Sequence, residues 1–241
     1  MKGEGALVTI DDLKLFDLQL FQPRHGYRYS LDPLLLARFC GELKPGGAII
    51  DLGAGCGIIA LVLARLNPAA SVLAVENNPD MAALAERNIQ HNDLGGRVSV
   101  HAEDVINLRT NHPDSGFDLV VSNPPFRTPW SGRISPRAGR DAARHESTAT
   151  LADFMAAAKY LVKPSGRICF IQLPSRMPEF MALASEMKLA VLRVRMIHNN
   201  AESPATMFMA ELAKGRRSAT VVESPLFVRD RDGEYTDEVW R

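Results

Sequence analysis

Apolar blocks separated by polar stretches alternate along the middle of the chain, in a pattern that predicts strands and helices in turn. The short apolar runs that predict strands lie at 48–52, 71–76, 97–101, 117–122 and 167–173. The expected helices cover 57–66, the segment from a cap at Asn78 to about Asn92, and 151–162. Because strands that alternate with helices build a mostly parallel sheet covered on both faces, we expect an α/β fold.

Residues that favour turns and helix caps mark several boundaries. Local apolar alternation over 13–30, interrupted by a Pro-Arg-His-Gly break, predicts a short N-terminal hairpin. Asp32 as a cap and Pro33 at the first helical position then begin a helix. Thr150 and Asp153 form the pattern of a capping box before the last long helix.

The C-terminal third departs from the strand–helix alternation. A Pro-Ser-Gly turn at 164–166 separates the last long helix from the next strand. The apolar stretches 189–197 and 206–212 are too close for a crossover connection, so they predict an antiparallel pair that closes the sheet. We therefore expect an N-terminal hairpin and helix over 1–47, packed on a core over 48–241 as a single structural unit.

Composition and charge narrow the class of protein. The 241 residues are 46% hydrophobic and 23% charged, which suits one α/β domain. Since 28 basic and 28 acidic residues balance, a contact with nucleic acid must come from a local basic patch. The three cysteines and six histidines show no disulfide or metal spacing, so no metal is expected. Without a long apolar run or a signal-peptide pattern, we expect a cytoplasmic protein outside the membrane, with a monomer favoured.

A glycine-rich loop, DLGAGCG, follows the first strand of the core and begins at Asp51. Gly53, Gly55 and Gly57 allow a tight turn and a close approach to a ligand beside a helix N-terminus. A dinucleotide fingerprint would have glycine where this chain has Ile58, and the Asp51 carboxylate would repel a pyrophosphate. The loop suits a ligand with a cationic amino group, although a purely structural turn remains an alternative.

Polar side chains end three further strands of the core. Glu76 ends the second strand, where a carboxylate can accept hydrogen bonds from a ribose diol. Asp104 follows the third strand and could accept from an adenine amine, and Asn123 follows the fourth. Any one of these residues could be a solvated strand end. Because the carboxyl ends of parallel strands meet at one sheet edge, the four positions together indicate a nucleotide-type site.

The motifs DLGAGCG, AVENN, AEDV and SNPPF, spread over roughly residues 48–175, resemble those of the S-adenosylmethionine-dependent Rossmann-like methyltransferases. The match is to their amino-methylating branch, marked by [D/N]-P-P-[Y/F/W]. The resemblance implies a seven-stranded sheet whose last strand is antiparallel, and S-adenosyl-L-methionine as the cofactor, with S-adenosyl-L-homocysteine as product. The cofactor-binding residues that it implies are Asp51, Gly53, Ala54, Gly55, Gly57, Glu76, Asn77, Asp104, Val105 and Tyr29.

The same resemblance gives the Asn-Pro-Pro-Phe segment at 123–126 a catalytic role. The Asn123 side-chain oxygen and the Pro124 carbonyl would accept hydrogens from an exocyclic amine and favour a pyramidal nitrogen. Pro125 would hold that carbonyl in place, and Phe126 would stack on the base. Catalysis would then rest on positioning and charge complementarity.

The flanking segments resemble those of the bacterial tRNA adenine-N6 methyltransferases that modify the adenine next to the anticodon of a valine tRNA. These segments are GYRYSLDPLLLARF, ARHE, PSR and SPLFVRDRDGEYTDEV. The implied reaction is methylation of adenine N6 in RNA, with tRNA as the expected substrate. The alternatives are methylation of guanine N2 in ribosomal RNA or of a protein glutamine, and a non-catalytic nucleotide- or RNA-binding module. A nicotinamide oxidoreductase is disfavoured by Ile58 and the acidic loop.

A basic stretch at 127–146 follows the Asn-Pro-Pro-Phe segment and lacks an apolar period. Such a loop beside an active site is typical of a flap that contacts RNA phosphates, although an ordinary solvated loop is the alternative. The arginines expected to contact the RNA substrate are Arg127, Arg133, Arg137, Arg140 and Arg144.

Overall fold

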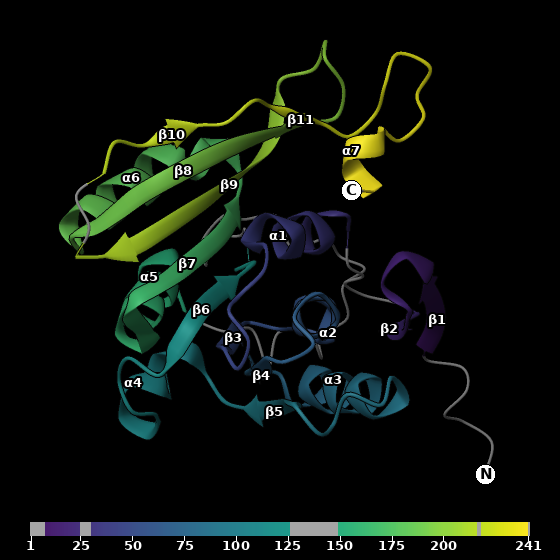
Figure 1. Ribbon diagram of the computed structural model, residues 1–241, viewed down its shortest axis with the longest axis vertical. Coiled ribbons are helices and arrows are strands. Elements are labelled where there is room, and N and C mark those ends of the chain that lie inside the picture. Colours follow the sequence, from purple (N-terminus) through teal and green to yellow (C-terminus); the bar gives the residue numbers. More distant parts are fainter. Residues whose placement is uncertain (1–7, 25–29, 126–148, 216–217, 241) are drawn as a thin grey trace, which may run out of the picture.

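The computed structural model describes residues 8–24, 30–125, 149–215 and 218–240. At its centre is a sheet in the strand order β10-β8-β9-β7-β6-β3-β4-β5, with β11 also paired to β8 (Figure 1). The strands of this sheet are β3 (Ala48–Leu52), β4 (Ser71–Glu76), β5 (Val98–Ala102), β6 (Phe117–Ser122), β7 (Val162–Gln172), β8 (Leu189–His198), β9 (Ala205–Lys214), β10 (Val221–Val222) and β11 (Leu226–Phe227).

The topology contains the expected seven-stranded arrangement, with an antiparallel strand, inside a sheet of nine strands. β3 pairs in parallel with β4 and β6, and the parallel arrangement continues through β5 on one side and β7 on the other. β9 runs antiparallel to both β7 and β8, so the predicted closing pair is correct. The short strands β10 and β11 pair in parallel with β8 and extend the sheet beyond the predicted seven strands.

Helices cover both faces of the sheet (Figure 1). Side chains of α1, α2 and α3 pack in one core with Ile49, while those of α5 and α6 pack in the other with Ile50 and Leu52. A sheet buried on both faces needs apolar residues at successive positions, which explains the continuous apolar runs. No helix among the described residues is long and apolar enough to cross a membrane. The α-helices are α1 (Asp32–Cys40), α2 (Ile58–Leu66), α3 (Pro79–His91), α4 (Leu108–Asn111), α5 (Leu151–Leu161), α6 (Met177–Glu186) and α7 (Asp237–Trp240).

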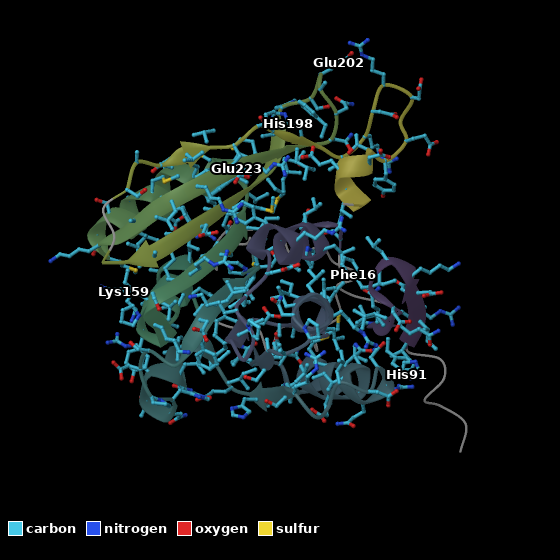
Figure 2. All side chains as sticks on the ribbon, in the orientation of Figure 1. Phe16, His91, Lys159, His198, Glu202 and Glu223 are labelled. Atoms are coloured by element: carbon cyan, nitrogen blue, oxygen red, sulfur yellow. The ribbon has the colours of Figure 1, made fainter. Side chains whose placement is uncertain are left out.

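The N-terminal hairpin exists, but its predicted bounds are wrong. β1 (Val8–Leu13) and β2 (Leu18–Pro23) form it, joined by a 3-10 turn, so it begins earlier than the local alternation indicated. It lies beside α2 and α3, where Phe16 and His91 are labelled in Figure 2. The next helix begins one residue earlier than predicted, because Leu31 and not Asp32 occupies the N-cap position and Asp32 is the first residue of α1.

The predicted break at 164–166 is also wrong, because β7 runs without interruption from Val162. Gly166 lies where the pairing with β6 shifts register, and a Cβ there would come within 2.9 Å of two β6 carbonyl oxygens. The proline and glycine therefore mark an irregularity within the strand instead of its start. The capping box of Thr150 and Asp153 on α5 is confirmed, whereas α6 was not among the predicted helices.

A charged cluster connects the C-terminal strands to α1. Arg193 on β8 contacts Glu211 and Glu223 at 2.9 Å each, and its guanidinium donates to the Phe39 carbonyl at 2.6 Å. The same group lies 3.9 Å above the Phe39 ring. Because Glu211 is 6% exposed, its carboxylate depends on these contacts and on Arg167, at 3.5 Å, for compensation of its charge.

Replacing Arg193 with methionine should lower the free energy of unfolding by about 3 kcal/mol, because a buried carboxylate loses its nearest cation. Urea unfolding measured by circular dichroism checks this. Arg231→Met, at an exposed position, is the matched control and should change stability by less than about 0.5 kcal/mol. Equal stability of the two variants would show that the cluster contributes nothing.

Candidate active site

The candidate site lies where β3, β4, β5 and β6 end. The strand order reverses direction at β3, which has β4 on one side and β6 on the other. In open α/β sheets such a switch point is where ligands bind, outside the carboxyl ends of the strands. Asp51 is in register with Ala74 and Val121, so its neighbours across the sheet are residues close to the ends of β4 and β6.

The glycine-rich loop bends sharply between β3 and α2. Gly53, Gly55 and Gly57 have φ angles of +74°, +56° and +86°, a region that other L-residues rarely adopt. The backbone N–H groups of Gly53 and Ala54 both donate to the Val75 carbonyl, at 2.9 and 3.0 Å. These bonds hold the loop against β4 and place it at the N-terminus of α2, as the sequence predicts.

Position 57 favours glycine over alanine for two reasons. Its φ is left-handed, and a Cβ would lie 3.2 Å from the Ala85 Cβ on α3. We expect Gly57→Ala to destabilise the protein by about 1–2 kcal/mol and to weaken binding of a ligand at the loop. Gly96→Ala, with open space around its Cβ, is the control and should be near neutral. Thermal unfolding with and without ligand separates the two effects.

Glu76 is fixed by two backbone donors. Its Oε2 accepts from the Gly55 N–H at 2.8 Å and its Oε1 from the Asn78 N–H at 2.9 Å. Asn78 in turn caps α3 by accepting from two N–H groups of the first helical turn. The carboxylate is 8% exposed, and each oxygen keeps a lone pair for a further donor. Asn77 lies between these two residues and is half-buried.

Asp51 differs from Glu76 and Asp104 because its carboxylate is fully buried with little to stabilise its charge. Its side chain is fully buried, and neither carboxylate oxygen has a hydrogen-bond partner of good geometry within the described part of the chain. Burial raises the pKa of Asp51 to about 8, with a further rise from the charge of Glu76 and a partial offset from the Ala60 backbone. A buried carboxylate left in this state indicates a missing hydrogen-bond donor.

The end of β5 leads into a 3-10 turn that begins at Val105. Asp104 caps this turn, since its Oδ1 accepts from the Ile106 N–H at 3.0 Å. The preceding residue is held to β4, because the Glu103 N–H donates to the Glu76 carbonyl at 3.0 Å. Val105 is buried, Asp104 is half-buried and Ile106 is exposed.

Asn123 presents a second unpartnered oxygen at the end of β6. Ser122 anchors the strand end by donating to the Leu52 carbonyl at 2.7 Å. The next side chain, Asn123, has a buried Oδ1 with no hydrogen-bond partner among the residues that the structure describes. Pro124 is buried and Pro125 exposed. Phe126, Tyr29 and the arginines predicted to contact RNA lie outside the described residues.

One residue that supports the candidate site was missed in the sequence. Asn88 on α3 is fully buried, donates to the carbonyls of Phe21 and Cys56 at 3.0 and 2.9 Å, and accepts from the Phe21 N–H at 2.7 Å. It therefore joins β2 of the hairpin to the glycine-rich loop. An amide on the buried face of a helix was the available sign, but only the fold shows which backbone groups it contacts.

A family model covers the part of the chain that contains this site. The family model "Methyltransferase small domain" matches residues 33–202, which include the glycine-rich loop, all four strand ends and Asn123. The chain belongs to the methyltransferase small-domain family. It is accordingly a methyltransferase that uses S-adenosylmethionine. The orphaned Asp51 carboxylate fits this cofactor, because the cofactor carries a cationic amino group and the buried acid lacks a donor.

Named relatives agree with this family, and a solved structure shares the fold. A protein of Porphyromonas gingivalis named tRNA1(Val) (adenine(37)-N6)-methyltransferase is 32% identical over 77% of this chain and 73% of its own length. A protein of the same name from Serratia proteamaculans is 32% identical over 90% and 82%. The fold resembles a predicted O-methyltransferase from Agrobacterium tumefaciens, with a TM-score of 0.65 and 22% identity over 80% of this chain and 88% of that one.

Proposed function

We propose that this methyltransferase transfers a methyl group from S-adenosylmethionine to the exocyclic N6 amine of an adenine in tRNA, next to the anticodon. The observation that carries the proposal is the buried, unpartnered Asn123 Oδ1 at the switch-point edge, one residue before a buried proline. An acceptor without a donor at this point suits a substrate –NH2 group. The names of the relatives from two bacterial genera support tRNA adenine as its source.

The cofactor would be held by the strand ends and would supply an electrophilic methyl group. Asp51 would accept from its amino group, Glu76 from its ribose hydroxyls and Asp104 from its adenine amine. Gly53, Ala54, Gly55, Gly57, Asn77, Val105 and Tyr29 would complete the cofactor site. The fixed position of Glu76, with two backbone donors, supports this assignment, because a bound diol would meet a carboxylate that needs no reorganisation.

The substrate amine would be oriented by Asn123 and Pro124. The exocyclic nitrogen of adenine is a weak nucleophile, because its lone pair is delocalised into the ring. Two acceptors on its hydrogens would favour a pyramidal nitrogen with a free lone pair, and Phe126 would stack on the base. No strong base is required, since the alkylated amine loses its proton readily. The residues proposed to contact RNA phosphates are Arg127, Arg133, Arg137, Arg140 and Arg144.

Methyl-labelled S-adenosylmethionine, incubated with separate pools of unmodified tRNA, ribosomal RNA and release factor, tests the proposal. Digestion to nucleosides should yield label as N6-methyladenosine from tRNA, and the Asn123→Ala variant should yield none above background. Label in N2-methylguanosine or in protein would keep the amine clamp and overturn the substrate. Absence of label in all pools, with cofactor bound, would favour a non-catalytic binding module.

A further inference from the structure

Three metal-ligating side chains meet beside the end of β5. His101 lies in β5, Glu103 directly follows it, and His112 follows α4. Each offers a ligand atom, and the three atoms lie within 4.8 Å of one another. The spacing of these residues along the chain matches no zinc motif, so the sequence indicated no metal. The turn through α4 returns the chain to β5 and creates the cluster.

The distances suit a transition metal after a small side-chain movement. Glu103 Oε2 and His112 Nε2 are 3.1 Å apart, and the rings of His101 and His112 are 5.4 Å apart between centroids. Two ligands of a tetrahedral zinc ion at ~2.1 Å are separated by roughly 3.3 Å. The Glu103–His112 pair already has close to this separation. His101 is exposed, so its ring can rotate toward the pair without disturbing the core.

Neighbouring groups hold the two less exposed ligands, Glu103 and His112, as is usual at metal sites. The Asn111 side chain donates to Glu103 Oε1, which leaves Oε2 directed at the imidazole of His112. The Tyr160 hydroxyl donates to the His112 carbonyl at 3.2 Å and fixes its backbone. The side chains of His112 and Glu103 are 13% and 14% exposed, so water competes little for either.

We propose that His101, Glu103 and His112 bind one Zn²⁺ ion, with water as the fourth ligand. Two imidazoles and one carboxylate are a ligand set that zinc accepts, whereas Mg²⁺ and Ca²⁺ prefer oxygen ligands. Cys40, Cys56 and Cys169 are buried and separate from the cluster. The metal would link the end of β5 to the segment after α4 and thereby close the loop that carries Asp104. The binding itself does not depend on the proposed function.

Isothermal titration of tag-free, chelator-treated full-length protein with ZnCl2 tests this site. We expect one equivalent to bind with micromolar or tighter affinity and to raise the Tm of the protein. Co²⁺ in place of zinc should give the visible absorption of a low-symmetry site. His101→Ala should weaken zinc at least about tenfold and should not unfold the protein, because the side chain is exposed.

The control is His198→Ala, at the far end of β8 (Figure 2), which should leave zinc binding unchanged. A second variant, His112→Gln, keeps a polar side chain beside Glu103 and should also weaken zinc. Absence of stoichiometric zinc uptake by the wild type would overturn the proposal. Zinc binding by the His101→Ala and His112→Gln variants with the affinity of the wild type would also overturn it. Cofactor binding by both variants confirms that they are folded.

Discussion

Replacing Asn123 with alanine should lower the rate of methyl transfer by about 100- to 1,000-fold while the affinity for S-adenosylmethionine stays unchanged. The variant loses one of the two proposed acceptors on the substrate amine, an interaction that matters in the transition state and not in cofactor binding. The side-chain oxygen has no partner within the described chain, so its loss leaves no protein donor unsatisfied and the fold should keep its stability. Single-turnover assays with tRNA and calorimetric titration of the cofactor measure the two quantities.

Two further variants separate this role from a general effect at the strand end. Asn123→Asp keeps an acceptor oxygen and should retain much of the activity that alanine loses. Asn199→Ala changes an exposed asparagine between β8 and β9 and should leave both rate and affinity as in the wild type. Wild-type turnover by Asn123→Ala, with intact cofactor binding, would exclude the proposed clamp. An equal loss in the alanine and aspartate variants would favour a role for the amide NH2 instead.

Much of the sheet could be predicted because local chemistry determines it. β3 and β6 are apolar at most positions, since the sheet is buried on both faces, and their bounds match the apolar runs. The interior of β7 was harder to predict from the sequence. Its Pro-Ser-Gly sequence is typical of a turn, and only the pairing with β6 shows that Gly166 lies in a register shift. Tertiary pairing there outweighs local propensity.

The location of the candidate site could also be predicted from the sequence, whereas the surroundings of its side chains could not. Asp51, Glu76 and Asp104 could be assigned to one edge, because parallel strands end on the same side of a sheet. Their different environments could not be predicted. Backbone donors on two loops satisfy Glu76, whereas Asp51 is buried without a partner, and this contrast depends on distances across the sheet. The same limit applies to Asn88, whose partners are 32 and 67 residues away in the chain.

Replacing Asp51 with asparagine should weaken S-adenosylmethionine binding by about 100-fold and yet stabilise the ligand-free protein at alkaline pH. The proposed contact with the cofactor amino group is a charge-assisted hydrogen bond in a buried site, which a neutral amide reproduces poorly. Without the cofactor the same carboxylate carries a cost of burial that the Ala60 backbone offsets only in part. A residue that is needed for ligand binding but lowers the stability of the ligand-free protein is typical of a ligand site.

The pKa of Asp51 determines how the stability difference between the wild type and Asp51→Asn changes with pH. The pKa of Asp51 is about 8 in the folded protein, against 3.8 for an ordinary aspartate, so the folded state holds a proton that the unfolded state has released. The stability due to this residue is therefore fully present below about pH 4 and is lost as the pH rises toward 8. The asparagine side chain of the variant has no proton to lose, so the advantage of Asp51→Asn should grow by about 1.4 kcal/mol per pH unit over that window, to about 6 kcal/mol in all, and then stay constant. Urea unfolding of both proteins from pH 5 to 9 measures it, and a difference that does not change with pH would show that the folded protein keeps this carboxylate ionised throughout.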